Sequence, residues 1–333
     1  MRPTIYTIAE KAGVSIATVS RALNNSPRVS EATRARILQI MEEMGYQPNA
    51  AARGLALNTT ETLAIVLPQI SGPFFSELIR GAESVSRQNH YHLLVYNHEE
   101  AGDSDPLLKI LSARADGLIL SAGCVSEEYL RALLRRGFPF VLLGSALPGL
   151  SANSIQPENE SGAYQLTRHL VRDHAYRRVA YINGPRDRSH SDERLRGYRR
   201  ALAEANLPWR ADLVMDGDFD EAGGYSAMLR LLDLPERPEA VFASNDQMAI
   251  GALAAVNERG LRVPEDIAIA GFDDIPTARY LQPALTTVNQ AIFRQGVLAV
   301  ELLLAHLADP ATPPREILIP TTLVIRRSCG CNF

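Results

Sequence analysis

Beyond residue 60, apolar residues gather in short runs that alternate with longer amphipathic segments. The first set of runs is LAIVL at 63–67, HLLVY at 92–96, GLILS at 117–121 and FVLL at 140–143. The second set is RVAYI at 178–182, LVMD at 213–216, AVFAS at 240–244 and IAIAG at 267–271. Short apolar strands separated by helical stretches are typical of parallel βαβ units. The pattern predicts a body of two α/β lobes, each with a parallel, doubly wound sheet.

Residues 1–47 show helical spacing instead. Thr7 and Glu10 form a capping-box pattern, which predicts that a first helix starts at Thr7. Ser15 is expected to cap a second helix, and Ser30 a third one whose apolar residues recur at helical spacing. We therefore expect an α-helical head of three short helices that share one apolar core.

Only a short turn around Gly13 separates the first two predicted helices. Two helices joined by such a turn form a helix-turn-helix, whose second helix can enter the DNA major groove. Ile16 and Ala17 are candidate contacts to base edges, and Arg21 can donate to guanine. Short polar side chains are candidates for phosphate oxygens: Ser15, Thr18, Ser20 and Asn24. Thr4, Ser30 and Thr33 complete the candidate DNA contacts of the head.

A plain three-helix domain with a solvated polar surface is the alternative for this head. DNA binding is favoured because Arg21 and the hydroxyls share the expected exposed face, while Val19 and Leu23 take the buried one. The charge distribution points the same way. Residues 1–60 carry seven lysines and arginines against four glutamates, a balance of +3, so the remainder of this chain of net charge −4 carries −7. A small basic module on an acidic body suits a polyanionic partner.

The overall composition, 333 residues with 46% hydrophobic content, suits two or three globular domains. The first residues do not form a secretory signal, and no apolar run approaches membrane-spanning length, so we expect a cytoplasmic protein. Three cysteines, Cys124, Cys329 and Cys331, have no ligand-like spacing to histidines, so neither a disulfide framework nor a metal site is predicted. The segment CGC at 329–331 can bind a stray metal, but a solvent-exposed tail is the favoured interpretation.

Motifs of enzymes were sought along the whole chain. The sequence contains no G-x-G-x-x-G after a strand, no G-x-x-x-x-G-K-[ST], no G-x-S-x-G and no H-E-x-x-H. No nucleophile is visibly paired with a base. We therefore expect a binding protein that has neither a catalytic site nor a cofactor.

The chain resembles the lactose/galactose repressor family of bacterial transcription regulators. The resemblance begins with TIAEKAGVSIATVSRALNNSPRVSEATRARILQIMEEMGYQPNAAARGLA. It continues through GPFFSELIRGAE, RRVAYINGP, ERLRGYRRAL, SNDQMAIGAL and IAGFDDIPTARYLQPALTTV, and so covers nearly the whole chain. It implies a DNA-binding domain at 1–47, a hinge helix and linker at 48–60 and an effector-binding domain at 61–333.

For the hinge, PNAAARGLALN at 48–58, the resemblance implies a helix that orders only when two subunits meet on DNA. Leu55 then lies where it wedges into the minor groove, an insertion that kinks the duplex. Asn49 is a plausible cap, and Ala52 and Ala56 are small enough for close helix contact. A flexible linker is the alternative for the free protein.

For the body, the resemblance implies a fold like the periplasmic binding proteins of type I, in which the chain crosses between the lobes three times. The first lobe is expected at about 61–157 and 291–319, and the second at about 158–290 and 320–333. The segment 292–308 then returns to the first lobe before the last strands close the second.

Ligands of open parallel sheets bind beyond the carboxyl ends of the strands, where several distinctive residues fall. The effector site implied by the resemblance consists of Phe75, Arg194, Phe219, Asn245, Asp273 and, as a weaker member, Gln290. Charged and amide groups can form hydrogen bonds with hydroxyls, and aromatic faces can stack on a flat ring or on a sugar. Each residue also has a structural alternative, such as helix capping for Asp273. Gly144, Ser145 and Glu158 depart from the family pattern and put the contacts from their segments in doubt.

The sequence therefore predicts a homodimeric, effector-responsive repressor of carbohydrate genes on a near-palindromic operator, released when a small sugar closes the lobes. No leucine heptads follow the strand-like LVIRR at 323–327, so a dimer rather than a tetramer is expected. A purine or nucleoside corepressor is the alternative effector. A cytosolic small-molecule-binding or sugar-processing protein without DNA binding is the alternative of a different class.

Overall fold

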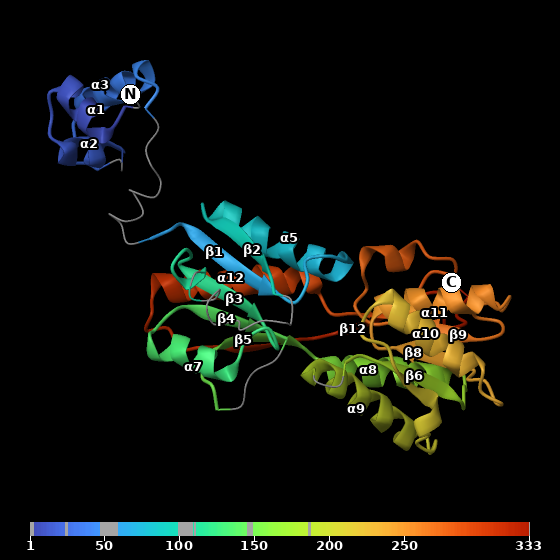
Figure 1. Ribbon diagram of the computed structural model, residues 1–333. Coiled ribbons are helices and arrows are strands. Elements are labelled where there is room, and N and C mark those ends of the chain that lie inside the picture. Colours follow the sequence, from blue (N-terminus) through green and yellow to red (C-terminus); the bar gives the residue numbers. More distant parts are fainter. Residues whose placement is uncertain are drawn as a thin grey trace. The chain divides into compact units, whose positions relative to one another are not determined.

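The computed structural model describes residues 3–23, 26–46, 59–98, 109, 111–144, 149–185 and 188–332. The chain divides into two compact units, Met1–Thr60 and Glu61–Phe333 (Figure 1). The first unit is the head and the second is the body, and each is described by itself.

The head contains the three predicted helices, α1 (Ile5–Ala12), α2 (Ile16–Leu23) and α3 (Glu31–Glu43). Their shared core comprises Ile8, Ala9, Ala12, Val19, Ala22, Val29, Ile37 and Met41. Gly13 ends α1 in the left-handed conformation, with φ 62°, and the turn to α2 is as tight as expected. Helix-turn-helix geometry therefore follows from packing two short apolar faces on α3.

The first helix begins two residues earlier than predicted, so the assignment of Thr7 as its N-cap is wrong. Thr4 is the N-cap, and its backbone N–H donates to Thr7 Oγ1 over 2.8 Å while the Thr7 N–H donates to Thr4 Oγ1 over 3.4 Å. A hydroxyl at the third helical position thus replaces the expected Glu10 carboxylate in the capping box. The earlier start lets Ile5 pack against the core of the head.

Ser15 and Ser30 cap the other two helices, as predicted. The Thr18 N–H donates to Ser15 Oγ over 3.1 Å, and the Thr33 N–H donates to Ser30 Oγ over 3.3 Å. All three helix starts of the head therefore carry a hydroxyl cap.

The first lobe of the body has one parallel six-stranded sheet in the order β11-β5-β4-β3-β1-β2. Its strands are β1 (Thr62–Leu67), β2 (His92–Asn97), β3 (Gly117–Ser121), β4 (Phe140–Leu143), β5 (Asn153–Pro157) and β11 (Glu316–Ile319). Among the described residues, its helices include α5 (Pro73–Gln88), α7 (Glu127–Arg135) and α12 (Ile292–Ala308). Gly81 and Gly296 let α5 and α12 pack backbone to backbone, because a Cβ at either position would lie 2.1 Å from a carbonyl oxygen of the other helix.

The second lobe has a parallel four-stranded sheet in the order β7-β6-β8-β9. Its strands are β6 (Val179–Asn183), β7 (Val214–Asp216), β8 (Ala240–Ala243) and β9 (Ala268–Ala270). Its α-helices are α8 (Asn159–Arg168), α9 (Ser189–Glu204), α10 (Glu221–Leu232) and α11 (Asp246–Glu258), and the short helices are η1 (His169–Asp173), η2 (Ala211–Leu213) and η3 (Pro276–Arg279). Central strands of both lobes are almost completely buried, as is typical of parallel sheets covered by helices.

Three segments connect the lobes, as the family resemblance implied. The chain leaves the first lobe between β5 and α8, and it returns between β10 (Thr287–Asn289) and α12. The last passage runs from β11, in the first sheet, to β12 (Thr322–Val324), which pairs antiparallel with β10.

The C-terminal CGC segment is not a solvent-exposed tail. Cys329 is fully buried in the core of the second lobe, and Cys331 packs against that core. The thiols are apolar enough to fill this space, and local sequence spacing gave no sign of it. Among the described residues, no helix combines the length and the apolar character that a membrane crossing would need.

Candidate functional site

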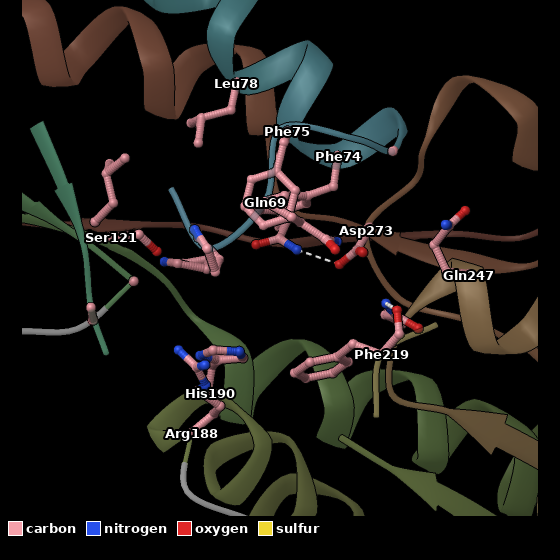
Figure 2. Close-up of a pocket in the computed structure, with 18 of the residues that line it drawn as sticks. Gln69, Phe74, Phe75, Leu78, Ser121, Arg188, His190, Phe219, Gln247 and Asp273 are labelled. Carbon is pink, nitrogen blue, oxygen red and sulfur yellow. Dashed lines mark hydrogen bonds between the residues drawn. The ribbon is translucent and has the colours of Figure 1, made fainter. Parts of the chain in front are cut away.

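A cavity of about 610 Å³ lies between the carboxyl ends of the strands of both lobes. Figure 2 shows Phe74, Phe75 and Leu78 of α5 on one side, with Phe219 and His190 opposite them. All six predicted effector residues line it: Phe75, Arg194, Phe219, Asn245, Asp273 and Gln290. Its volume falls within the range of small-molecule sites, about 300–1,000 Å³.

Arg194 and Asp273 form the charged centre of the cavity wall. Both side chains are buried, and Arg194 Nη1 lies 3.5 Å from Asp273 Oδ1. Arg194 also donates from Nε to Asn159 Oδ1 over 2.9 Å and from Nη1 to the Ser244 carbonyl. Gln290 donates to Asp273 Oδ1 (dashed in Figure 2). Both residues line the cavity.

Burial dominates the electrostatics of this pair. It raises the pKa of Asp273 to about 7, although the Arg194 charge and the Gln290 hydrogen bond favour the carboxylate. Burial also lowers the pKa of Arg194, against the attraction of Asp273. A buried ion pair of this kind is costly without further polar partners, and a ligand with several hydroxyls would supply them.

The Asn245 side chain lines the cavity and also forms hydrogen bonds that fix the backbone around it. It is the N-cap of α11, and its Oδ1 accepts the Met248 N–H over 2.9 Å. Its Nδ2 donates to the Phe219 carbonyl over 2.9 Å, and Phe219 has a positive φ of 63°. The amide therefore fixes the turn that presents the Phe219 ring, in addition to lining the cavity.

Aromatic rings form two walls of the cavity. The Phe219 ring lies over Gly184, where a Cβ would come within 2.2 Å of the ring, and it stacks on His190 with the centroids 5.3 Å apart. Burial, with the charges of Arg194 and Arg188, lowers the pKa of His190 to about 3, so this imidazole is neutral at neutral pH. Phe75 meets Phe74 edge to face on the other side, with centroids 5.0 Å apart.

Two of these residues lie within helices rather than directly at a strand end. Phe75 is in the first turn of α5 and not in the loop after β1. Arg194 is in the second turn of α9 and does not open it. The reason is that α5 begins at Pro73, a favoured first helical residue, and that α9 begins at Ser189, five residues before Arg194. Both side chains still reach the cavity.

The predicted DNA surface of the head lies on α2 and at the helix starts. Ile16, Ala17 and Arg21 are exposed, and 39% of the surface of Ile16 is accessible although it is a large apolar residue. Ser15 and Thr18 share a 2.9 Å hydroxyl hydrogen bond beside them. Val19 is buried and Leu23 packs on the core, so the predicted buried face is confirmed, whereas Thr18 on the predicted exposed face is only partly accessible.

Other head residues divide between this surface and the helix caps. Thr4, Ser15 and Ser30 cap helices, Thr33 bonds to Ser30 over 2.8 Å, and Ser20 is partly buried. Helix N-termini are themselves suited to phosphate. Asn24, Asn49, Ala52 and Leu55 lie outside the described residues.

The comparisons with known proteins agree with this architecture. Residues 4–49 match the model of bacterial regulatory proteins of the lacI family, and residues 167–329 match a periplasmic binding protein-like domain. The HTH-type transcriptional regulator GalR of Escherichia coli (strain K12) is 37% identical over 327 residues, covering 98% of this chain and 95% of that protein. This chain belongs to the lacI family.

Two solved structures extend the likeness to this lacI-family chain. A Lac repressor dimer bound to operator and the anti-inducer ONPF matches with a TM-score of 0.88 at 28% identity, covering 99% of both chains. A complex of the transcriptional regulator CelR with cellobiose matches with a TM-score of 0.74 at 32% identity, covering 98% of this chain and 100% of that one. The lacI-family chain is thus a DNA-binding transcriptional regulator with a two-lobed, type I periplasmic-binding-protein-like body.

Sequence reasoning missed several cavity residues of this lacI-family body. Asn159, which holds Arg194, follows β5, a strand too polar to be recognised. His190 and Arg188 lie at the start of α9, and Gln69 follows β1. The position of Gln69 just after the apolar run at 63–67 was an available signal, whereas Asn159 had none because its strand was not recognised.

The segments that depart from the family pattern contribute little side-chain chemistry. Gly144 lines the cavity, where it offers only backbone, and Ser145 lies outside the described residues. Glu158 is the N-cap of α8 without a side-chain capping bond and does not line the cavity. The neighbouring Asn159 does line it.

Proposed function

We propose that this regulator is a repressor of carbohydrate-utilisation genes that binds a near-palindromic operator as a homodimer and leaves it when a sugar occupies the cavity. The observation that carries the proposal is the combination in one cavity of a buried Arg194–Asp273 pair with the Phe75 and Phe219 rings. The structural relative with cellobiose supports a sugar as the ligand class.

The polar and apolar groups of the cavity match the two faces of a sugar. Hydroxyls can bridge a guanidinium and a carboxylate, which are the strong, charge-assisted partners. The apolar face of a pyranose can stack on an aromatic ring, as Phe219 offers. Arg194 and Asp273 belong to the second lobe, whereas Phe75 belongs to the first, so a ligand in contact with both favours one closure angle.

Closure can be transmitted to DNA through the first lobes of a dimer. An effector shifts the operator-bound state only by its different affinity for the two arrangements. A hundredfold change in operator affinity requires about 2.7 kcal/mol of such coupling. One or two charge-assisted hydrogen bonds made in only one arrangement supply this amount.

A purine or nucleoside corepressor is the second candidate, and the stacked rings of His190 and Phe219 favour it. A planar base can extend this stack on its outer face, and the neutral His190 can donate to or accept from a base. This ligand would strengthen operator binding rather than weaken it.

The test measures binding of the purified chain to labelled DNA from upstream of its own gene, by fluorescence anisotropy at fixed salt, with random DNA as competitor. A panel of mono- and disaccharides and of purines is then added. The proposal expects specific binding that a sugar weakens. Strengthening by a purine would select the second candidate. Absence of specific binding to any segment of the neighbouring promoters would contradict the repressor and favour a small-molecule-binding protein.

A further inference from the structure

Four potential metal ligands converge in the second lobe, away from the effector cavity. They are His169 and His174, at the end of the α8–η1 helix, and Cys329 and Cys331, at the C-terminal end of the chain. One ligand atom from each residue lies within 4.8 Å of all the others. Cys329 and His169 are buried, and Cys331 and His174 are partly accessible.

The separations of the ligand atoms fit one tetrahedral ion. Zinc lies about 2.0–2.1 Å from histidine nitrogen and about 2.3 Å from thiolate sulfur, so tetrahedral angles place two nitrogens about 3.3 Å apart and a nitrogen and a sulfur about 3.5 Å apart. The two Nε2 atoms are 3.2 Å apart. His169 Nε2 lies 3.5 Å from Cys329 Sγ and 3.7 Å from Cys331 Sγ, and His174 Nε2 lies 3.3 Å from Cys331 Sγ.

The backbone is arranged to bring these side chains together. His169 and His174 are five residues apart, a spacing that an α-helix of 3.6 residues per turn would place about 140° apart around its axis. The helix instead becomes a π-helix at His169–Asp173, whose wider turn bonds residues five apart and so aligns the two rings. Such π turns are frequent at functional sites.

Gly330, between the two cysteines, allows their segment to approach the histidines. Its φ is 105°, a conformation that side-chain-bearing residues rarely adopt. A Cβ there would lie 3.0 Å from the Tyr176 hydroxyl and 3.3 Å from His174 Nδ1. The glycine thus allows the C-terminal segment to approach the histidines closely enough for both sulfurs to face them.

Outer contacts orient the ligands in the manner of a metal site. His169 Nδ1 lies 2.8 Å from the Asp173 carboxylate, which fixes the tautomer with the Nε2 lone pair directed into the cluster. The Thr286 hydroxyl donates to Cys329 Sγ over 3.1 Å. Tyr176 stacks on the His174 ring at 5.4 Å and donates to the Cys329 carbonyl over 3.1 Å.

We propose that His169, His174, Cys329 and Cys331 bind one zinc ion, which fastens the C-terminal end of the chain to the π-helical end of α8. Two nitrogens and two sulfurs in a closed tetrahedral set are typical of structural zinc. The two cysteines follow β12 and the two histidines end the α8–η1 helix, so the ion would link these two segments. The α8 helix begins at Asn159, which lines the effector cavity.

The test begins with the whole chain, produced with zinc in the medium and purified without a metal-affinity tag. Metal analysis should find about one zinc per chain. Replacement by cobalt should produce the visible absorption of a tetrahedral thiolate site, which requires no operator or effector. The variants are Cys331→Ser and His174→Gln, and Cys124→Ser, a buried cysteine of the first lobe, is the matched control.

Wild type and the Cys124→Ser control should retain zinc and lose several degrees of thermal midpoint when a strong chelator removes it. Cys331→Ser and His174→Gln should bind zinc at least tenfold more weakly and respond less to the chelator. The proposal is overturned if the wild type holds no zinc and shows no cobalt spectrum under reducing conditions. It is also overturned if mass analysis finds a Cys329–Cys331 disulfide and the chain still binds no zinc after this disulfide has been reduced. Zinc binding by the variants that is as tight as in the control would overturn it as well.

Discussion

Asp273→Asn is the most informative change in the effector cavity, because it removes a charge with almost no change of shape. The side chain is buried, and Asn can still accept the hydrogen bond from Gln290 through its own oxygen. The variant keeps the cavity wall but cannot offer a carboxylate to a sugar hydroxyl or to Arg194.

The size of the effect follows from the ionic character of the lost contact. A hydrogen bond to a charged group contributes about 1.5–3 kcal/mol, so sugar affinity should fall about 10–150-fold at pH 8. In wild type the pKa of Asp273 is raised to about 7 by burial, so the carboxylate fraction rises from about 0.1 at pH 6 to about 0.9 at pH 8. Affinity for the sugar should therefore increase about tenfold over this interval in wild type and hardly at all in Asp273→Asn.

The same raised pKa has a consequence for the stability of the free protein. Between the unfolded pKa near 4 and the folded pKa of about 7, the native state binds more protons than the unfolded state. The free energy of unfolding should therefore decrease as pH rises from 4 to 7, and the buried Asp246, whose pKa is also raised by burial, contributes in the same direction. Asp273→Asn should reduce this decrease.

Isothermal titration at pH 6, 7 and 8 measures the affinities, and thermal unfolding without ligand measures the stability. The exposed Asp192→Asn, on the same helix as Arg194, is the control. A wild-type affinity that does not change between pH 6 and pH 8, or a variant that binds as tightly as wild type at pH 8, would refute the role given to the Asp273 carboxylate.

Two further predictions concern the DNA contacts and the cavity wall. Leu55→Ala and Arg21→Ala should each weaken operator binding about 10–100-fold while leaving binding to random DNA nearly unchanged, whereas Arg28→Ala, an exposed cation in the turn after α2, should reduce both alike in anisotropy titrations. Equal losses on both DNAs for Leu55→Ala would remove the wedge. Gly184→Ala places a Cβ 2.2–2.7 Å from three atoms of the Phe219 ring, so it should displace the ring and lower sugar affinity about tenfold without changing operator affinity measured in the absence of sugar. Unchanged calorimetric affinity would exclude Phe219 as a ligand-stacking wall.

Apolar content was sufficient to find the strands that carry most of the fold. All eight apolar runs correspond to strands. Six of them are largely buried on both faces and must therefore be almost continuously apolar, whereas β2 and β7 are partly exposed strands at sheet edges. β5, with the sequence NSIQP, was missed because its polar composition hides it. β11, a strand of only four residues with the sequence EILI, was also missed. Asn159, which follows β5, was lost with it.

The cavity residues were predicted because the family resemblance pointed to them, and their places after apolar runs are local features of the sequence. The hydrogen bonds among them are not local: Arg194 reaches Asn159 and Ser244, and Asn245 reaches the Phe219 carbonyl. The His–Cys cluster shows the same limit, since 157 and 162 residues separate Cys331 from His174 and His169, and only the fold reveals their proximity. Spacing rules for metal sites detect ligands within one loop or helix, not a set completed by the chain end.

The central claim is that a ligand held by Arg194 controls binding of DNA by the head. The most direct measurement is the operator affinity of wild type and Arg194→Ala, with and without the identified sugar, at one salt concentration. Wild type should lose about 100-fold in operator affinity with the sugar, which corresponds to about 2.7 kcal/mol of coupling. Arg194→Ala should bind the operator within about twofold of wild type and show no response at the same sugar concentration. A variant that still responds to the sugar with wild-type sensitivity would contradict the account, because the effector would then be bound elsewhere.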